Sequence, residues 1–491
     1  MRKFFAVVGM AVLALIAAVG AKTLLTSSRQ LAVAAATPVA VDGAAASARL
    51  GAAVRFKTIA SITDENANAA EFAGLHAHLQ SSFPKAHAVL QREVIGARSL
   101  VYTWPGSDPK APAVGLLAHQ DVVPVAPGTE ADWSQPPFAG AVTGGFIWGR
   151  GAWDDKGNLM SMMEAVELLA VSGFKPRQTI YLMFGHDEEV GGHRGAVQIA
   201  KLLQARGVRL QFVVDEGLLI TEGLMPGLAK PAALVGVAEK GYLTLQLAAT
   251  AAPGHSSMPP PQAGQSAIGM LSTGLVRLED KQMPLAVRGL AQEMFETLAP
   301  EMGGLNRVFL SNLWLFKPII EQQLAKGAST NAMLRTTTAL TMLNAGNADN
   351  VMPGRANATV NFRLLPGDSS DRVVEHVTRT VANPAIKIEK APGFSEPSKV
   401  SPTDAPGFRL INKTLRQLHP DVVVAPGLMI AATDSRHFDA VADAIYKFSP
   451  VRAKPEDLKR FHGTNERIST ANYVELIQFY HQLIVNSAPS P

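Results

Sequence analysis

The fold of this chain is decided by the stretch Thr179-Ile-Tyr-Leu-Met-Phe-Gly-His-Asp-Glu-Glu-Val-Gly-Gly192. Its apolar run from Thr179 to Phe184 predicts a buried strand. The strand leads directly into two adjacent carboxylates, Glu188 and Glu189. Burial and mutual repulsion both oppose charge on such a pair, so the pair needs a compensating cation, or one member must hold and release a proton.

Two other apolar runs end in the same kind of polar group. Val114–Ala118 leads into His119-Gln-Asp121. Leu210–Val214 leads into Asp215-Glu-Gly217. In open α/β sheets, functional sites collect at the carboxyl ends of the strands. Three strand ends that carry histidine and carboxylates therefore indicate a metal hydrolase site.

Strand and helix patterns alternate from about Arg49 to Glu239, with glycine at helix ends, which is the signature of an α/β sheet. The pattern changes near Lys240, because Tyr242–Leu247 and Asn357–Arg363 alternate like half-exposed antiparallel strands. We therefore predict an α/β fold, with a mixed sheet flanked by helices, that is interrupted by an α+β lid of the dimerisation type.

A helical block lies inside the predicted lid. It includes Val308–Leu324, whose apolar residues recur at helical spacing and predict core packing. The α/β pattern resumes near Val400. The predicted boundaries are a signal peptide or anchor at 1–25, a linker at 26–48, catalytic segments at 49–240 and 396–487, and the lid at 241–395.

Composition restricts the possible functions. The chain of 491 residues is 47% hydrophobic and 18% charged, which is typical of a folded protein with two domains. Its net charge is only +4 and it contains no Lys/Arg run, so nucleic acid is not an expected partner. The chain has no cysteine, which leaves histidine and carboxylates as the available metal ligands.

The N-terminus predicts export. Arg2 and Lys3 precede the uncharged run Phe4–Ala21, and Val19-Gly-Ala21 fits the rule for signal cleavage. The run is slightly long for a signal peptide and slightly short for a relaxed membrane span. We favour an uncleaved anchor with the body on the periplasmic or extracellular side, and a secreted protein is the alternative.

A glycine-rich loop, Gly149-Arg-Gly-Ala-Trp-Asp-Asp-Lys-Gly157, carries two consecutive aspartates. One aspartate suffices to cap the following helix, so the second needs another role. Asp154 is the candidate bridge between two metals. With His119, Glu189, Asp215 and the distant His462 it makes five ligands, which gives three to each of two metals when Asp154 is shared.

Taken together, these motifs resemble the co-catalytic zinc peptidase family of aminoacylases, glutamate carboxypeptidase and peptidase T. The resemblance is closest to the branch of carboxypeptidase S and the N-fatty-acyl-amino-acid synthase/hydrolase, and it extends from about Arg55 to Asn486. The most specific stretches are Gly149–Gly157, Gly185–Gly192, Asn350-Val-Met-Pro353 with Val360-Asn-Phe-Arg363, Thr433-Asp-Ser-Arg436 and His462–Ile468.

The resemblance implies a role for each matching residue. His119 and Asp215 would hold one zinc, and Glu189 and His462 the other, with Asp154 as the bridge. Cobalt or manganese could substitute for zinc. Asp121 would orient His119, Glu188 would be the general acid/base, and His255 on the lid would stabilise the oxyanion. Asn350, Arg363 and Arg436 would bind the substrate carboxylate.

The implied activity is hydrolysis of the amide bond to a C-terminal amino acid. The substrate would be a peptide, as for a carboxypeptidase, or an N-acyl amino acid, as for an aminoacylase. In the family the oxyanion histidine comes from a dimer partner, or an enlarged lid replaces that partner, so a homodimer is one alternative. A catalytically inactive, membrane-anchored binding protein on the same fold is the competing hypothesis.

Overall fold

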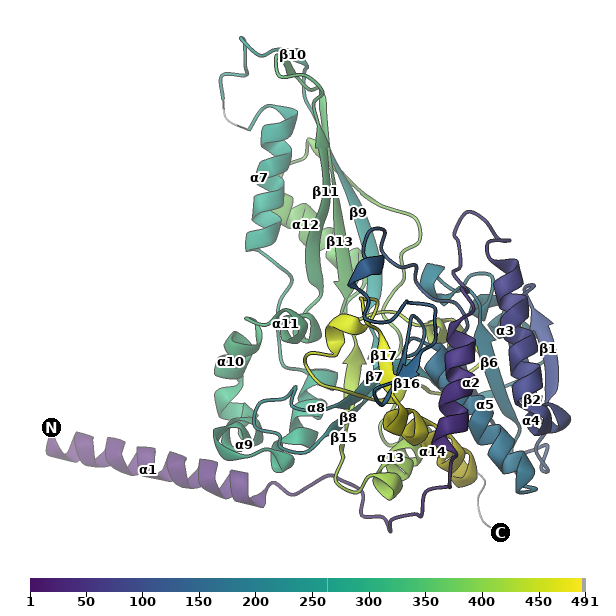
Figure 1. Cartoon of the computed structure of the whole chain (residues 1–491). Helices are drawn as coiled ribbons and strands as arrows, with labels where there is room; N and C mark the ends of the chain where they lie inside the picture. Colours follow the sequence, from purple (N-terminus) through teal and green to yellow (C-terminus); the bar gives the residue numbers. More distant parts are fainter. Residues whose placement is uncertain (263, 488–491) are drawn as a thin grey trace.

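The computed structural model describes residues 1–262 and 264–487 (Figure 1). Its body contains an eight-stranded mixed sheet with the order β1-β2-β6-β3-β7-β16-β8-β15. The strands β6, β3, β7 and β16 at its centre are parallel, so their carboxyl ends meet at one edge. The strands are β1 (Gln91–Ile95), β2 (Ser99–Trp104), β3 (Ala113–His119), β6 (Ile180–Gly185), β7 (Leu210–Thr221), β8 (Ala232–Glu239), β15 (Val423–Met429) and β16 (Ile445–Ala453).

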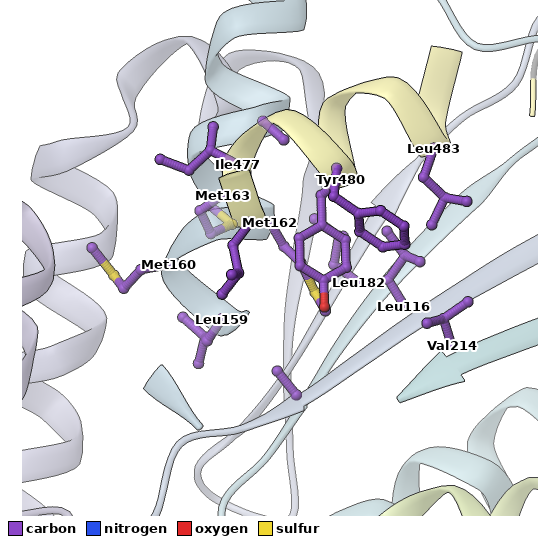
Figure 2. Packing of buried hydrophobic residues seen from close by; sticks show 14 of the residues in the cluster. Leu116, Leu159, Met160, Met162, Met163, Leu182, Val214, Ile477, Tyr480 and Leu483 are labelled. Atoms are coloured by element: carbon purple, nitrogen blue, oxygen red, sulfur yellow. The ribbon is translucent and has the colours of Figure 1, made fainter. Parts of the chain in front are cut away.

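Helices cover both faces of this sheet. One face is covered by α2 (Gly43–Val54), α3 (Ala69–Ser82), α4 (Pro84–Val89), α5 (Lys156–Val171), α13 (Pro406–Leu418) and α14 (Thr470–Ser487). The other carries α6 (Ala196–Ala205) and the short helix η4 (Asp434–Phe438). Figure 2 shows Leu116, Leu182 and Val214, from three neighbouring strands, packed with Met162 of α5 and Tyr480 of α14. This core holds the strand ends rigidly in place.

A three-stranded sheet connects two distant parts of the chain. Its order is β17 (Arg467–Ser469), β5 (Phe146–Trp148) and β4 (Val142–Thr143). Arg467 pairs with Trp148 in this sheet, so the segment around His462 lies beside the loop that begins at Gly149. Three single-turn helices complete the loops of the body: η1 (Glu130–Asp132), η2 (Glu188–Val190) and η5 (Leu458–Arg460).

The lid is a separate four-stranded antiparallel sheet with the order β11-β13-β9-β14. Its strands are β9 (Gly241–Thr250), β11 (Thr337–Ala345), β13 (Arg355–Leu364) and β14 (Ile386–Lys390), and α7 (Ala267–Asp280) and α12 (Ser370–Val381) cover one face. A small ribbon of β10 (Gly254–His255) and β12 (Val351–Met352) lies at the far end of this sheet (Figure 1).

The helical block predicted inside the lid packs elsewhere. It consists of α8 (Gly289–Leu298), η3 (Ala299–Glu301), α9 (Gly304–Ser311), α10 (Leu313–Leu324) and α11 (Ala328–Leu334). Met294 and Ile320 pack with Val423 and Ala425 of β15, so these helices cover the edge of the body sheet. The expected helix over Val308–Leu324 is broken at Asn312, whose side chain bonds to the carbonyl oxygen of Val308.

The N-terminal segment is also more ordered than a free linker. Helix α1 (Arg2–Leu25) has no fully buried residue, and only Val19 and Thr23 near its C-terminal end are half-buried. The following residues lie on the body, where the Gln30 side chain bonds to both the N–H and the carbonyl oxygen of Val424 on the edge strand β15. Helix α2 begins at Gly43, within the predicted linker, and buries Ala46. The predicted fold class, an α/β sheet interrupted by an α+β lid, is confirmed.

Candidate metal centre

The carboxyl ends of β3, β6 and β7 bring histidine and carboxylates together. His119 is the last residue of β3 and pairs with Gly185 at the end of β6. Glu188 and Glu189 follow in η2, and Glu216 projects from β7. Candidate ligand atoms of His119, Glu188 and Glu189 all lie within 4.8 Å of one another. The predicted convergence of strand ends therefore produces one acidic site.

Two groups of three ligands share Asp154. In the first, His119 Nε2 lies 3.0 Å from Asp154 Oδ1 and 3.5 Å from Glu216 Oε1. In the second, His462 Nε2 lies 2.9 Å from Asp154 Oδ2 and 3.3 Å from Glu189 Oε2. The two oxygens of Asp154 thus face different histidines, which is the arrangement expected of a bridging carboxylate.

The expectation for Asp215 requires a correction, because Glu216 takes the place beside His119. Both oxygens of Asp215 accept backbone hydrogen bonds, at 2.8 Å from Ser435 N and 2.9 Å from Glu216 N. Successive side chains of a strand point to opposite faces. Val213, two residues before Asp215, packs against Phe438 of η4, and Asp215 reaches Ser435 of the same short helix. Glu216 therefore points the other way.

Asp121 positions two parts of the site. Its Oδ1 lies 3.4 Å from His119 Nδ1, and its two oxygens accept the backbone N–H groups of Glu188 and Glu189, each at 3.1 Å. His119 Nδ1 also lies 3.0 Å from the Asp121 carbonyl oxygen. These contacts direct Nε2 of His119 toward the candidate ligands and hold the turn that carries the two glutamates.

Glu466, which was not among the predicted site residues, organises the loop before Asp154. Glu466 is fully buried, and its Oε1 accepts the N–H groups of Gly151, Trp153 and Asp154 at 2.8, 3.0 and 3.1 Å. Its Oε2 accepts a 2.6 Å hydrogen bond from Arg150. The signal in the sequence that could have found it is its place within the specific stretch His462–Ile468.

Burial and like charge shape the electrostatics of the site. Burial raises the pKa of Glu188 and of Glu189, and burial with the nearby Asp154 raises the pKa of Glu216 to about 8. Hydrogen bonds to Asp154 and Glu189 raise the pKa of His462 to about 10. The same carboxylates would stabilise a cation.

The candidate ligands have the features that a metal site requires. Glu189 Oε1 is buried and has no hydrogen-bond partner among the described residues. Buried carboxylates are expected to be paired or to coordinate a metal. Nitrogen and oxygen donors without thiolate suit zinc and related divalent ions. The residues present therefore fit two metal ions.

His255 and Asn350 lie far from this cluster. His255 is exposed in β10, where its Nδ1 lies 2.8 Å from Ser257 Oγ. The carbonyl oxygen of Asn350 accepts a hydrogen bond from Ser256 in the same ribbon. Figure 1 shows β10 at the far end of the lid, away from β7 and β17. The structure thus brings these two predicted residues to each other but not to the ligands.

Of the two predicted arginines, Arg436 lies in η4 of the body and Arg363 in β13 of the lid. Arg436 Nη2 is 3.4 Å from the carbonyl oxygen of Gly191, directly after the turn that holds Glu188 and Glu189. Arg363, in β13, stacks on Tyr242 at 4.8 Å. Burial lowers the pKa of Arg363, and the charge of Arg436 contributes in the same direction.

Two three-ligand groups with a shared carboxylate, and the half-buried Glu188 beside them, define a metal-dependent hydrolase. The chain belongs to peptidase family M20/M25/M40, whose family model matches residues 115–486. It is a metallo-amidohydrolase of that family, in the predicted branch. An inactive binding protein is not favoured.

Individual comparisons agree with this assignment. The chain is 42% identical over 443 residues to "Probable carboxypeptidase S-like 2" of Dictyostelium discoideum, which covers 89% of this chain and 84% of the relative. It is 41% identical over 442 residues to "N-fatty-acyl-amino acid synthase/hydrolase PM20D1" of Xenopus tropicalis, over 89% and 85% of the two chains. The solved M20 family metallo-carboxypeptidase Sso-CP2 from Sulfolobus solfataricus shares the fold, with a TM-score of 0.63, 17% identity, and 91% and 100% of the two chains covered.

Proposed function

We propose that this chain hydrolyses the amide bond between an acyl or peptidyl group and a C-terminal amino acid, with two zinc ions. His119, Asp154 and Glu216 would hold one ion, and Asp154, Glu189 and His462 the other. Cobalt or manganese could replace zinc, because the donors are nitrogen and oxygen atoms. The observation that carries the proposal is the contact of the two Asp154 oxygens with two different histidines.

The residues around these ligands have matching roles. Two bound ions would lower the pKa of a water molecule and polarise the amide carbonyl. Glu188 is the proton carrier, because burial raises the pKa of its carboxyl group and its backbone is held by Asp121. It takes the proton from the attacking water and delivers it to the leaving nitrogen.

The substrate class follows from the arginines and the relatives. Arg363 and Arg436 would bind the free carboxylate, since a guanidinium can bind a carboxylate through two hydrogen bonds. The names of the relatives indicate a peptide or an N-fatty-acyl amino acid as the substrate. Helix α1 would suit an apolar acyl group, because it would place the enzyme at a membrane.

Localisation and assembly belong to the same proposal. The 24-residue helix α1 contains an 18-residue window with a mean hydropathy of 2.6, and it would anchor the exported body to the outer side of a membrane. Asn350 and His255 would reach a substrate when the lid moves or when a second copy supplies them. The edge strand β11 favours a second copy, because Met342 and Leu343 on it are each 60% exposed.

The function can be tested with the full-length chain, purified in detergent and loaded with zinc. We expect it to release free amino acid from at least one member of a panel of dipeptides and N-acyl amino acids. Glu188→Gln should retain both metals and lose about 10²–10⁴-fold in turnover, which is the usual contribution of a general base. Glu222→Gln removes an ion pair with Arg452 and serves as the matched control.

The outcomes test the substrate class, the role of Glu188 and the set of metal ligands separately. The preferred member of the panel distinguishes a carboxypeptidase from an N-acyl-amino-acid hydrolase. Unchanged turnover in Glu188→Gln would contradict the role of Glu188 as the proton carrier. A chain that is folded but binds no zinc would contradict the assigned ligand set.

A further inference from the structure

A cavity of about 440 Å³ separates the C-terminal end of α1 from the helices that cover the edge of the body sheet. Lys22 and Arg29 line it from the N-terminal segment. Ser311, Leu313, Trp314 and Lys317 line it from α9 and α10. This cavity is remote in sequence from every candidate ligand, and the proposed hydrolysis does not use it.

The polar lining of the cavity is suited to an anion. Lys22, Arg29 and Lys317 are opposed by one acidic group, Glu296, which pairs with Arg29 at 2.9 Å. Ser311 is only 7% exposed, and its Oγ has no hydrogen-bond partner among the residues that the structure describes. A buried hydroxyl without a partner is costly, and an anionic oxygen would satisfy it.

The apolar surroundings are suited to a bilayer. Trp314 is 60% exposed at the cavity, and Leu305 on α9 and Ile319 on α10 are 71% and 57% exposed. Tryptophan is enriched at the level of lipid headgroups, because its ring is apolar and its N–H group is polar. Exposed apolar side chains beside basic groups are the usual composition of a surface that lies on an anionic membrane.

Helix α1 fixes the orientation of this surface. Asn312 donates hydrogen bonds to Thr23 Oγ1 at 2.9 Å and to the Val19 carbonyl oxygen at 3.3 Å. The junction of α9 and α10 is thereby attached near the C-terminal end of the apolar run, beside α1 (Figure 1). If α1 crosses the bilayer, Asn312, Trp314 and Lys317 lie at the depth of the headgroups.

We propose that the cavity between α1 and α10 binds the headgroup of an anionic phospholipid, with α9 and α10 resting on the bilayer. Lys22 and Lys317 would contact the phosphate, the Ser311 hydroxyl would donate to it, and Leu313 and Trp314 would contact the acyl chains. This inference rests on the proposed role of α1 as an anchor. In this arrangement the N-terminal segment, α9 and α10 together would hold the enzyme in one orientation on the membrane.

The test uses the full-length chain in phosphatidylcholine vesicles that contain a small fraction of brominated lipid. Bromine quenches tryptophan fluorescence at short range, and Trp314→Phe identifies the part of the signal that comes from Trp314. Each basic residue near an anionic surface contributes a preference of about fivefold. We expect brominated phosphatidylglycerol to quench Trp314 at a roughly fivefold lower mole fraction than brominated phosphatidylcholine.

Variants and flotation separate the possible failures. Lys317→Glu should abolish the preference for phosphatidylglycerol without releasing the chain from vesicles, whereas the matched change Lys387→Glu on β14 should not alter it. Quenching that is equal for the two lipids would overturn the anionic site. Absence of Trp314 quenching in chains that float with the vesicles would overturn the membrane contact and leave the anchor intact. Chains that do not float would overturn both, while hydrolysis of the substrate panel is measured independently.

Discussion

Arg150 and Glu466 form a buried ion pair across 316 residues of sequence, with Arg150 Nη1 at 2.6 Å from Glu466 Oε2. Arg150 also donates to the carbonyl oxygen of His462 at 3.1 Å. The other oxygen of Glu466 holds the N–H group of Asp154. One charge pair therefore positions the proposed bridging carboxylate and a terminal ligand relative to each other.

Glu466→Gln should be strongly destabilising. The amide can still accept from the loop N–H groups, but its NH₂ group then faces Arg150 and leaves a buried guanidinium without a counter-charge. We expect a loss of about 3–5 kcal/mol in the free energy of unfolding, measured by denaturant titration. Glu93→Gln breaks a surface pair with Arg206 and should cost less than about 1 kcal/mol. Equal losses in the two variants would contradict the role of Glu466.

The choice between Glu216 and Asp215 can be decided by counting metals. We expect Glu216→Gln to lower the zinc content from two ions per chain to one, measured by mass spectrometry of the metal, because it removes a carboxylate beside His119. Asp215→Asn should keep two ions and cost about 1–3 kcal/mol of stability, because the two backbone N–H groups face different oxygens and one of these becomes an NH₂ group, which cannot accept. The opposite result would return the ligand role to Asp215.

Lys240 should make stability depend on pH in a defined direction. It lies between the body and the lid, and its Nζ donates to the carbonyl oxygens of Ala332 and Arg335, each at 2.9 Å. Burial, with the nearby Arg363, lowers the pKa of Lys240 to about 7. The unfolded chain, with an ordinary lysine pKa, binds more protons between pH 7 and about 10.5, so the contribution of Lys240 to stability rises with pH across that window.

The matching experiment compares the wild-type chain with Lys240→Met by chemical denaturation at pH 7 and pH 9. The wild type should gain up to about 2–3 kcal/mol relative to the variant over this interval. Lys413→Met, an exposed change on α13, should leave the pH dependence as it is in the wild type. A wild type that loses stability relative to Lys240→Met as pH rises would contradict the direction of this pKa shift.

The sequence predicted that His119 and Glu189 lie together because buried strands that end in polar groups leave few alternatives at a parallel sheet edge. Asp154 was predicted from the two consecutive aspartates of the glycine-rich loop, and His462 only from its company with the other motifs. It assigned the ligand role to Asp215 and gave none to Glu216, which lies beside His119 in the structure. The three residues directly before Asp215, Phe212-Val-Val214, are all apolar, so no alternation there reveals which side chain faces the site. The role of Glu466 depends on the pairing of β17 with β5, which local patterns do not encode. The position of His255 depends on how the lid sheet extends from the body.

The position of His255 leads to a test of whether a second copy completes the site. We expect His255 to act on the partner's metals, because β10 lies at the far end of the lid (Figure 1) and β11 offers an exposed edge with Met342 and Leu343.

Glu188→Gln and His255→Ala should each be inactive alone while retaining zinc. When the two variants are unfolded together and refolded in equal amounts, mixed dimers should contain one site with both residues intact. Hydrolysis should then return to about a quarter of the wild-type rate, since half of randomly formed dimers are mixed and each has one working site. Refolding each variant alone gives the baseline. No recovery from a mixture that forms dimers would show that His255 serves the metals of its own chain through a movement of the lid.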